Sequence, residues 1–411
     1  MSTTSGSGKV WEPKHPVNLN SGDLIQDKYK YYDWLRENAP VYRGKFMFMN
    51  SYLISRYEDC EFVLKDPIFA RSRGNGSWSW LMPSSLKAIT NMMLYKDGKE
   101  HRRLRTLVHK AFTPRAITKL DSRIGEICDS FLDDIEASGK DTFDLVPTYA
   151  YPLPVKVIGE MLGVPDDDMD DFQKSVNVLL QGLTGFRIIK TILWDLRKTV
   201  GFIKKIIAKK RKAPKDDILT ALIQAEEGDD RFTEQELVSM VMLLIIAGYE
   251  TTVDLIKCVT VALLAHPEQL QLLKENPELM DGAIEETLRF LGPVHGTELI
   301  YASEEVTIRG VVIPKGHLVT PLLGSANRDP DVFEEPNRFD ITRERIRHLG
   351  FGKGIHYCLG APLARLETKI AMRSLFARFP DLALAQPAET LTFQKVPLFH
   401  RFEQVPLRFF P

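Results

Sequence analysis

The sequence contains few cysteines, no long hydrophobic run and almost no net charge. Its four cysteines among 411 residues are too few for a disulfide framework and suit a reducing compartment such as the cytoplasm. The longest apolar run covers residues 240–247, well short of the ~20 residues that a membrane-spanning helix needs. Because 54 basic residues balance 55 acidic ones, the composition favours neither a nucleic-acid binder nor a disordered acidic chain. We therefore expect a cytoplasmic enzyme or binding protein without a membrane anchor.

The chain also lacks internal repeats and any linker rich in proline, glycine or serine that could separate two cores. Its first nine residues, MSTTSGSGK, are polar and lack the apolar segment of a signal peptide. We predict a flexible N-terminal tail over residues 1–20 and a single domain over residues 21–411.

Helical hydrophobic spacing dominates the remaining sequence. It is nearly continuous over residues 98–264 and returns at 268–290 and 359–379. Short β-like patterns interrupt it at 47–55, 306–308 and 311–314. The pattern predicts a mainly α fold with small β-sheets, of the α+β class.

A long apolar helix is predicted from Thr233 to Leu264. Thr233 and Glu236 have the spacing of a capping box, and residues 240–247 are apolar on all sides, so the helix must pass through the protein interior. It nevertheless contains the segment AGYETT at 247–252. A glycine inside a helix costs ~1 kcal/mol relative to alanine, and β-branched threonines lower helix propensity further. Such a segment is favoured where a ligand needs space and a hydroxyl, although threonines bonded back to the helix backbone would also explain it.

The segment FGKGIHYCLG at 351–360 carries the strongest local signal. Three glycines around one cysteine indicate a backbone that closely approaches a flat or bulky group. An amphipathic helix begins just after Cys358, and the positive end of a helix dipole stabilises a thiolate. A thiolate binds metals or attacks electrophiles. The alternative is a buried, unreactive cysteine beside a glycine turn.

Together these segments resemble the haem-thiolate monooxygenases of the cytochrome P450 family, specifically its soluble bacterial branch. The cysteine segment fits the family pattern FGxGxHxCxG at every fixed position, and AGYETT is similar to the family's oxygen-activating helix. Residues 286–289 resemble the family's Glu-x-x-Arg pair, and the segment around Arg338 resembles the one that completes its ion network. The resemblance implies the cytochrome P450 fold, a buried haem b, and insertion of one oxygen atom from O2 into a substrate.

The resemblance also implies a role for each matching residue. Cys358 would be the axial thiolate of the haem iron, and Glu250 and Thr251 would deliver protons during oxygen activation. The residues expected to contact the haem are His101, Arg105, His356, Phe351, Gly352 and Ala247. The residues expected to form a structural ion network are Glu286, Arg289 and Arg338.

One position departs from the family pattern. Most bacterial relatives have an arginine that binds a haem propionate two residues before the alanine equivalent to Ala302, and this chain has Ile300 there. We expect His101, Arg105 and His356 to anchor the propionates without it, because buried carboxylates need charge-assisted donors.

The resemblance implies a hydrophobic small-molecule substrate that is hydroxylated or epoxidised. Most residues at the family's pocket positions are apolar, which suits such a substrate, although apolar residues on these elements are core residues about as often. The pocket candidates are Trp80, Ile89, Leu243, Ile246, Ala247, Val294, Gly296 and Val396.

Electrons must come from separate proteins, because no GxGxxG segment follows a predicted strand and the haem domain fills the chain. A ferredoxin and its reductase are the expected donors. Two other functions stay open: a haem-thiolate sensor or carrier that binds a ligand without turnover, and a peroxygenase driven by peroxide. The Glu250–Thr251 pair argues against both, since a sensor does not need it and peroxide-driven relatives usually alter it.

Overall fold

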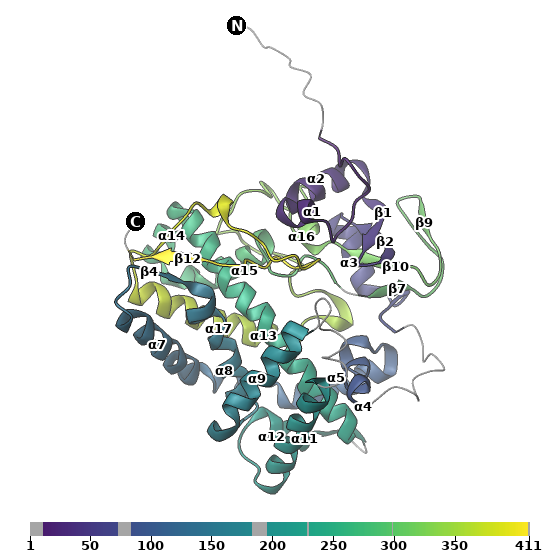
Figure 1. Cartoon of the computed structure of the whole chain (residues 1–411). Helices are drawn as coiled ribbons and strands as arrows, with labels where there is room; N and C mark the ends of the chain where they lie inside the picture. Colours follow the sequence, from purple (N-terminus) through teal and green to yellow (C-terminus); the bar gives the residue numbers. More distant parts are fainter. Residues whose placement is uncertain (1–10, 73–83, 183–194, 228–229, 298, 410–411) are drawn as a thin grey trace.

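The computed structural model describes residues 11–72, 84–182, 195–227, 230–297 and 299–409. Most of these residues are helical, and the strands form small sheets (Figure 1). The α-helices are α1 (Gly22–Gln26), α2 (Lys28–Asn38), α3 (Tyr57–Lys65), α4 (Ser84–Thr90), α5 (Gly98–Ala111), α6 (Pro114–Thr118), α7 (Asp121–Ala137), α8 (Pro152–Met161), α9 (Asp166–Gly182), α11 (Leu196–Lys212), α12 (Ile218–Ile223), α13 (Glu234–Ala265), α14 (Pro267–Glu275), α15 (Met280–Phe290), α16 (Leu323–Ala326) and α17 (Ala361–Arg378).

The strands are β1 (Val41–Phe46), β2 (Met49–Ile54), β3 (Phe69–Ala70), β4 (Thr142–Asp144), β5 (Glu226–Glu227), β6 (Asp230–Arg231), β7 (Ile300–Ala302), β8 (Val306–Ile308), β9 (Val311–Ile313), β10 (Leu318–Pro321), β11 (Ala383–Leu384) and β12 (Pro406–Arg408). The largest sheet has the order β1-β2-β10-β7-β3, with β10 parallel to β2 and the other pairs antiparallel. This combination of many helices with small sheets confirms the predicted fold class.

The helices and the main sheet occupy different parts of the molecule. Figure 1 shows β1, β2, β7 and β10 on one side, next to α1, α2, α3 and α16, while the long helices α7, α8, α9, α11 and α13 fill the other side. The largest hydrophobic cluster lies among these long helices, and two smaller clusters lie beside the main sheet. The segments of the site connect the two parts.

α13 begins and runs as predicted. The Thr233 side chain accepts a hydrogen bond from the Glu236 backbone N–H, and the Glu236 carboxylate accepts one from the Thr233 backbone N–H, so the capping box is confirmed. Among the described residues, α13 is the one helix long and apolar enough to cross a membrane, but 67% of its apolar window is buried inside the protein. Such burial is typical of a core helix.

The structure differs from the predictions in three places. The β-like pattern at 47–55 supplies only the second strand of a hairpin, β2, whose first strand is β1, with Phe46 paired to Met49 across a tight turn. The helix expected over 268–290 is divided into α14 and α15, because Pro277 lacks the N–H that a continuous helix would need. Val17 and Leu19, expected in a flexible tail, are buried, and the Leu19 N–H donates to the Lys45 carbonyl (2.9 Å).

Candidate active site

Cys358 lies in a tight loop between the 3₁₀ turn η7 (Gly354–His356) and α17. Its backbone N–H donates to the carbonyl oxygen of Phe351 at 2.9 Å, which closes the loop. Gly352 and Gly354 have φ values of 71° and 70°, in the left-handed region that side chains disfavour. A Cβ on Gly354 would also lie 2.6 Å from the carbonyl oxygen of Leu64 in α3. These two glycines are therefore required by the loop backbone and by its close packing on α3.

The Cys358 thiol has surroundings unlike those of the other cysteines. Cys60, Cys128 and Cys258 are buried, whereas Cys358 is partly exposed. Desolvation raises the pKa of the Cys358 thiol, while the backbone N–H of Gly360 and the positive charge of Arg105 act to lower it. The sulfur thus lies at the start of α17, where N–H groups without helical partners favour a thiolate. Its partial exposure favours a ligand role over the alternative of a buried, unreactive cysteine.

The middle of α13 has one side that the protein does not cover. Ala247 is exposed and Ile246, Gly248 and Thr251 are partly exposed, although most of this helix is buried. Ala247 and Thr251 lie one turn apart on the same face. α13 also packs against α17, whose first turn carries the cysteine loop (Figure 1). The described part of the protein therefore leaves this face of the AGYETT segment uncovered.

Both threonines of this segment bond back to the helix. The Thr251 hydroxyl donates to the Ala247 carbonyl at 2.6 Å, and the Thr252 hydroxyl donates to the Gly248 carbonyl at 2.7 Å. The alternative explanation for this segment, threonines bonded back to the helix backbone, is therefore present. The two hydroxyls differ in their surroundings, because Thr252 is buried and Thr251 lies on the open side.

Glu250 is held by an arginine from the C-terminal segment. Arg401 Nη2 lies 2.8 Å from Glu250 Oε2, and its Nε donates to Asp254 Oδ2 at 2.8 Å. Asp254 in turn pairs with Lys257 (2.5 Å), one turn further along α13. Burial raises the pKa of Glu250, and the positive charge of Arg401 opposes this shift. No sequence motif marks Arg401, which is 151 residues away from Glu250 in the chain.

His101, Arg105 and His356 come together from α5 and the cysteine loop. The rings of His101 and His356 have centroids 4.4 Å apart. Arg105 Nε donates to His109 Nε2 at 2.9 Å, one turn further along α5. Burial lowers the pKa of His101 to about 4. The structure thus places all three predicted propionate-binding residues in one cluster beside Cys358, since the Arg105 charge acts on its thiol.

Comparison with known proteins decides the family. A family model described as Cytochrome P450 matches residues 11–387. The chain belongs to the cytochrome P450 family. It is 42% identical to Cytochrome P450 107B1 of Saccharopolyspora erythraea, over 94% of this chain and 96% of that protein. It is 38% identical to the vitamin D(3) 25-hydroxylase of Pseudonocardia autotrophica, over 96% of each. The structure of the Bacillus subtilis polyketide synthase P450 PksS superposes with a TM-score of 0.90, at 37% identity, covering 96% of this chain and all of that one.

The described residues fit haem b, the cofactor of this P450 family. Cys358 offers one soft ligand at a helix start, as an axial haem ligand requires. No group of three or more His, Cys, Asp or Glu side chains among the described residues could hold a metal ion. The exposed side of α13 at Ala247 leaves room for a flat group. The chain is therefore a P450 monooxygenase that receives electrons from redox partners.

The Glu-x-x-Arg pair forms a fully buried ion pair in this P450. Arg289 Nη2 and Nε lie 2.6 and 2.7 Å from the two Glu286 carboxylate oxygens, and both side chains are 0% exposed. Arg289 also donates to the backbone carbonyls of Asn327 and Pro336. One charged pair thus fastens α15 to two segments that precede the cysteine loop.

The predicted role of Arg338 in this network is corrected. Its guanidinium is 58% exposed and pairs with Glu335 at 2.9 Å, and only its carbonyl reaches Arg289 (2.9 Å). The side chain that approaches Glu286 is Arg343, at 3.4 Å. The segment around Arg338 matches the family pattern, but its turn directs the side chain outward.

A second ion pair supports the cysteine loop and was not expected from the sequence. Arg365 of α17 donates to Glu285 Oε1 and Oε2 at 2.6 and 2.9 Å, and its guanidinium lies 4.5 Å from the centre of the Phe351 ring. Although burial acts to raise it, hydrogen bonds from Arg365 and His348 hold the pKa of Glu285 at about 2. This pairing connects α15, α17 and the first residue of the cysteine loop.

The predicted pocket residues occupy several elements. Leu243 and Ile246 lie on α13, and the partly buried Ile89 lies on α4, which packs against α13. Val294 and Val396 are partly buried in two segments joined by the bridge of Val294 with Phe399. Trp80 lies outside the described residues.

The prediction that Gly296 lines the substrate pocket is corrected. It is buried, and a Cβ there would lie 2.5 Å from Leu398 Cδ2 and 3.1 Å from the Pro321 carbonyl oxygen. The absence of a side chain therefore allows close packing of Leu398, so this position is filled by protein.

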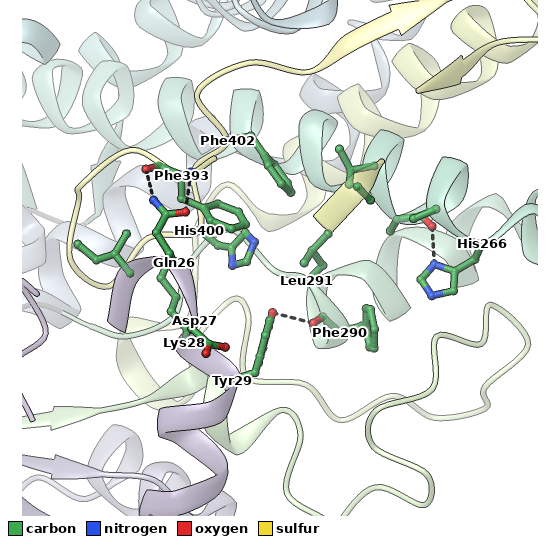
Figure 2. Close-up of a pocket in the computed structure, with 15 residues that line it drawn as sticks. Gln26, Asp27, Lys28, Tyr29, His266, Phe290, Leu291, Phe393, His400 and Phe402 are labelled. Atoms are coloured by element: carbon green, nitrogen blue, oxygen red, sulfur yellow. Dashed lines mark hydrogen bonds between the residues drawn. The ribbon is translucent and has the colours of Figure 1, made fainter. Parts of the chain in front are cut away.

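A cavity of about 220 Å³ lies near the C-terminal end of α13, between residues of α1, α2, α13 and the C-terminal segment. Figure 2 shows Tyr29 donating to the Phe290 carbonyl at its edge and His400 beside Phe393. Within the part of the chain that the structure describes, neither ring nitrogen of the buried His400 has a hydrogen-bond partner. None of the lining residues belongs to the cysteine loop or to residues 243–251. This cavity is therefore separate from the predicted substrate site, and Arg401, next to His400, connects its wall to Glu250.

Proposed function

We propose that this P450 hydroxylates or epoxidises a hydrophobic small molecule, with Cys358 as the axial ligand of haem b. The observation that carries this proposal is the exposed Ala247 in the middle of a buried helix, with Thr251 on the same face and the cysteine loop at the start of the adjacent helix. Leu243 and Ile246 are apolar neighbours of this open side, so they favour an apolar substrate.

Haem iron with a thiolate ligand supplies activation of O2, for which two electrons and two protons are needed. The Thr251 hydroxyl lies on the open side of α13 and can pass a proton there when it leaves the Ala247 carbonyl. Glu250, the preceding residue, is a partly buried carboxylate that renews this proton. Arg401 keeps the carboxylate in place and favours its charged form.

The role of Thr251 predicts a difference between two adjacent threonines. We expect Thr251→Ala to bind haem and substrate normally but to form about 10²-fold less product per electron consumed, because a positioned proton donor contributes at least that much. The missing product should appear as hydrogen peroxide. Thr252→Ala is the matched control, since it loses the same kind of backbone bond (2.7 Å) at a buried position. Equal coupling in the two variants would remove Thr251 from the reaction.

The contact of Arg401 with Glu250 predicts a shift in pH dependence. Because Arg401 acts to lower the pKa of Glu250, we expect Arg401→Gln to raise that pKa further above its usual value. Because Glu250 must carry the proton that it passes on, the alkaline limb of product formed per electron should then move to higher pH. Arg401→Lys keeps a positive charge and should move it less. An unmoved limb in Arg401→Gln would show that Glu250 is not the titrating group.

We propose a ferredoxin and its reductase as the electron donors, in the cytoplasm. Lys353 in the cysteine loop is partly exposed and pairs with Glu61 at 3.4 Å, so the surface over the sulfur carries charge that a protein donor can contact. The intact Glu250–Thr251 pair supports this electron-driven reaction over the sensor and peroxygenase alternatives.

One experiment tests the proposed function as a whole. Apolar compounds, including vitamin D(3), the substrate named for one relative, are screened for a shift of the ferric spin state, and those that shift it are incubated with ferredoxin, reductase and NADPH. We expect oxygenated product with these electron donors. Ligand binding without any product would favour the sensor, and product only with hydrogen peroxide would favour the peroxygenase.

A further inference from the structure

The position of the missing propionate arginine is filled by a hydrophobic residue. Ile300 on β7 is 3% exposed and belongs to the hydrophobic cluster between the main sheet and α3. An aliphatic side chain offers no hydrogen-bond donor to a carboxylate. A cation for this place must therefore come from another part of the chain.

The sheet places an arginine next to this position. β3 pairs with β7 in antiparallel register, with Phe69 opposite Ala302 and Ala70 opposite Tyr301. One further step in the same register puts Arg71 opposite Ile300. Directly opposite residues of an antiparallel pair direct their side chains to the same face, with Cβ atoms about 5 Å apart.

Hydrogen bonds connect Arg71 to the predicted propionate-binding cluster. The backbone N–H of Arg71 donates to Asp97 Oδ2 at 2.8 Å, and Asp97 Oδ1 lies 3.2 Å from His356 Nε2. The His356 ring in turn contacts the His101 ring. A single carboxylate, that of Asp97, thus links the Arg71 backbone to the pair of histidines.

The charges of this cluster call for a second arginine. Hydrogen bonds from His356 and two backbone N–H groups hold the pKa of Asp97 below its usual value, against the effect of burial, so Asp97 is charged. A histidine carries a charge only while it is protonated, whereas an arginine is always charged. Arg105 is then the one permanent cation among the three predicted residues, whereas haem b has two propionates. A permanent cation is missing, and Arg71 is close enough to act electrostatically on both histidines.

We propose that Arg71 binds a haem propionate. It takes the place of the arginine that most bacterial relatives have at the position of Ile300, so the cation comes from the end of β3 instead of from β7. The set of residues expected to anchor the propionates, His101, Arg105 and His356, thereby gains a fourth member. The inference concerns how the P450 retains its cofactor, and it is independent of the substrate and of the proton-delivery roles proposed above.

The test measures haem loss. The holoenzyme is mixed with excess apomyoglobin, and the rate of haem transfer is followed by absorbance for the wild type, Arg71→Gln, and Arg71→Gln combined with Ile300→Arg. We expect Arg71→Gln to lose haem about 10-fold faster or more, as for a lost hydrogen bond to a charged group, and Ile300→Arg to restore much of the retention. Arg43→Gln on β1 is the control for removal of an exposed arginine.

Each result decides the proposal. A haem-loss rate in Arg71→Gln equal to that of the wild type would overturn it, as would a faster rate that Ile300→Arg does not reverse. Thermal unfolding of each variant after haem removal separates lost fold stability from lost haem contacts, and Arg71→Lys provides a second variant that should retain haem better than Arg71→Gln. The spectral signature of the Cys358 thiolate should persist in all variants, so failure here leaves the haem-thiolate assignment intact.

Discussion

Replacing Cys358 with serine is expected to abolish monooxygenase activity and the thiolate signature of the ferrous carbonyl spectrum. The reason is that Cys358 is the partly exposed cysteine at the start of α17, while the other three are buried. Changes to residues that merely support a metal ligand cost about 10- to 100-fold in affinity or activity, and loss of the ligand itself should cost more. The carbonyl spectrum and product formation are measured on protein reconstituted with haem.

Cys258→Ser is the matched control for this experiment. Cys258 is buried on α13, and burial raises the pKa of its thiol, which disfavours the thiolate form that binds iron. This variant should keep the spectrum of the wild type. A thiolate spectrum that survives in Cys358→Ser would show that another cysteine ligates the iron, and the site described here would then be wrong.

Local patterns account for the parts of the site that could be predicted from the sequence. The cysteine loop, the capping box of α13 and the AGYETT segment are each determined within about ten residues, because glycine conformation, capping and helical spacing are short-range effects. The structure accordingly confirms the capping box and the positive φ at Gly352 and Gly354. The mainly α fold follows from the same helical spacing.

Long-range partners could not be predicted in the same way. Arg401 reaches Glu250, Arg365 reaches Glu285, and Asp97 reaches His356 from segments that are distant in the chain. A charged residue in one segment gives no sign of which distant carboxylate it will meet, since many exposed pairings have similar energies. Only packing of the helices and strands selects one partner.

Arg338 and Arg71 show how the same limit affects reasoning from a family pattern. The pattern locates a segment, but it does not determine which of its neighbours presents the charged side chain. Arg343 approaches Glu286 where Arg338 was expected, so a cation is retained there while the residue that carries it changes. Our proposal for Arg71, one residue beyond the β3–β7 pairs, is of the same kind.

Breaking the buried pair of Glu286 and Arg289 is expected to have the largest effect on stability. Both side chains are 0% exposed, so Glu286→Gln would leave the Arg289 charge buried without its counter-ion, at a cost of about 3–5 kcal/mol in the free energy of unfolding. The loss should also lower haem content, because Arg289 donates to the Asn327 carbonyl and Asn327 Oδ1 accepts from the Leu349 N–H (2.7 Å), two residues before the cysteine loop. Urea unfolding and haem content per protein are measured together.

The exposed pair of Arg338 and Glu335 is the control, since it has the same spacing and a similar distance (2.9 Å). Because its side chains are 58% and 62% exposed, solvent screens the attraction, and Glu335→Gln should cost less than about 1 kcal/mol. Equal effects of the two substitutions would mean that burial does not determine the strength of the pair. A stable Glu286→Gln protein that has lost its haem would instead indicate that the pair serves the cysteine loop more than the fold, because the backbone carbonyls held by Arg289 lead directly to that loop.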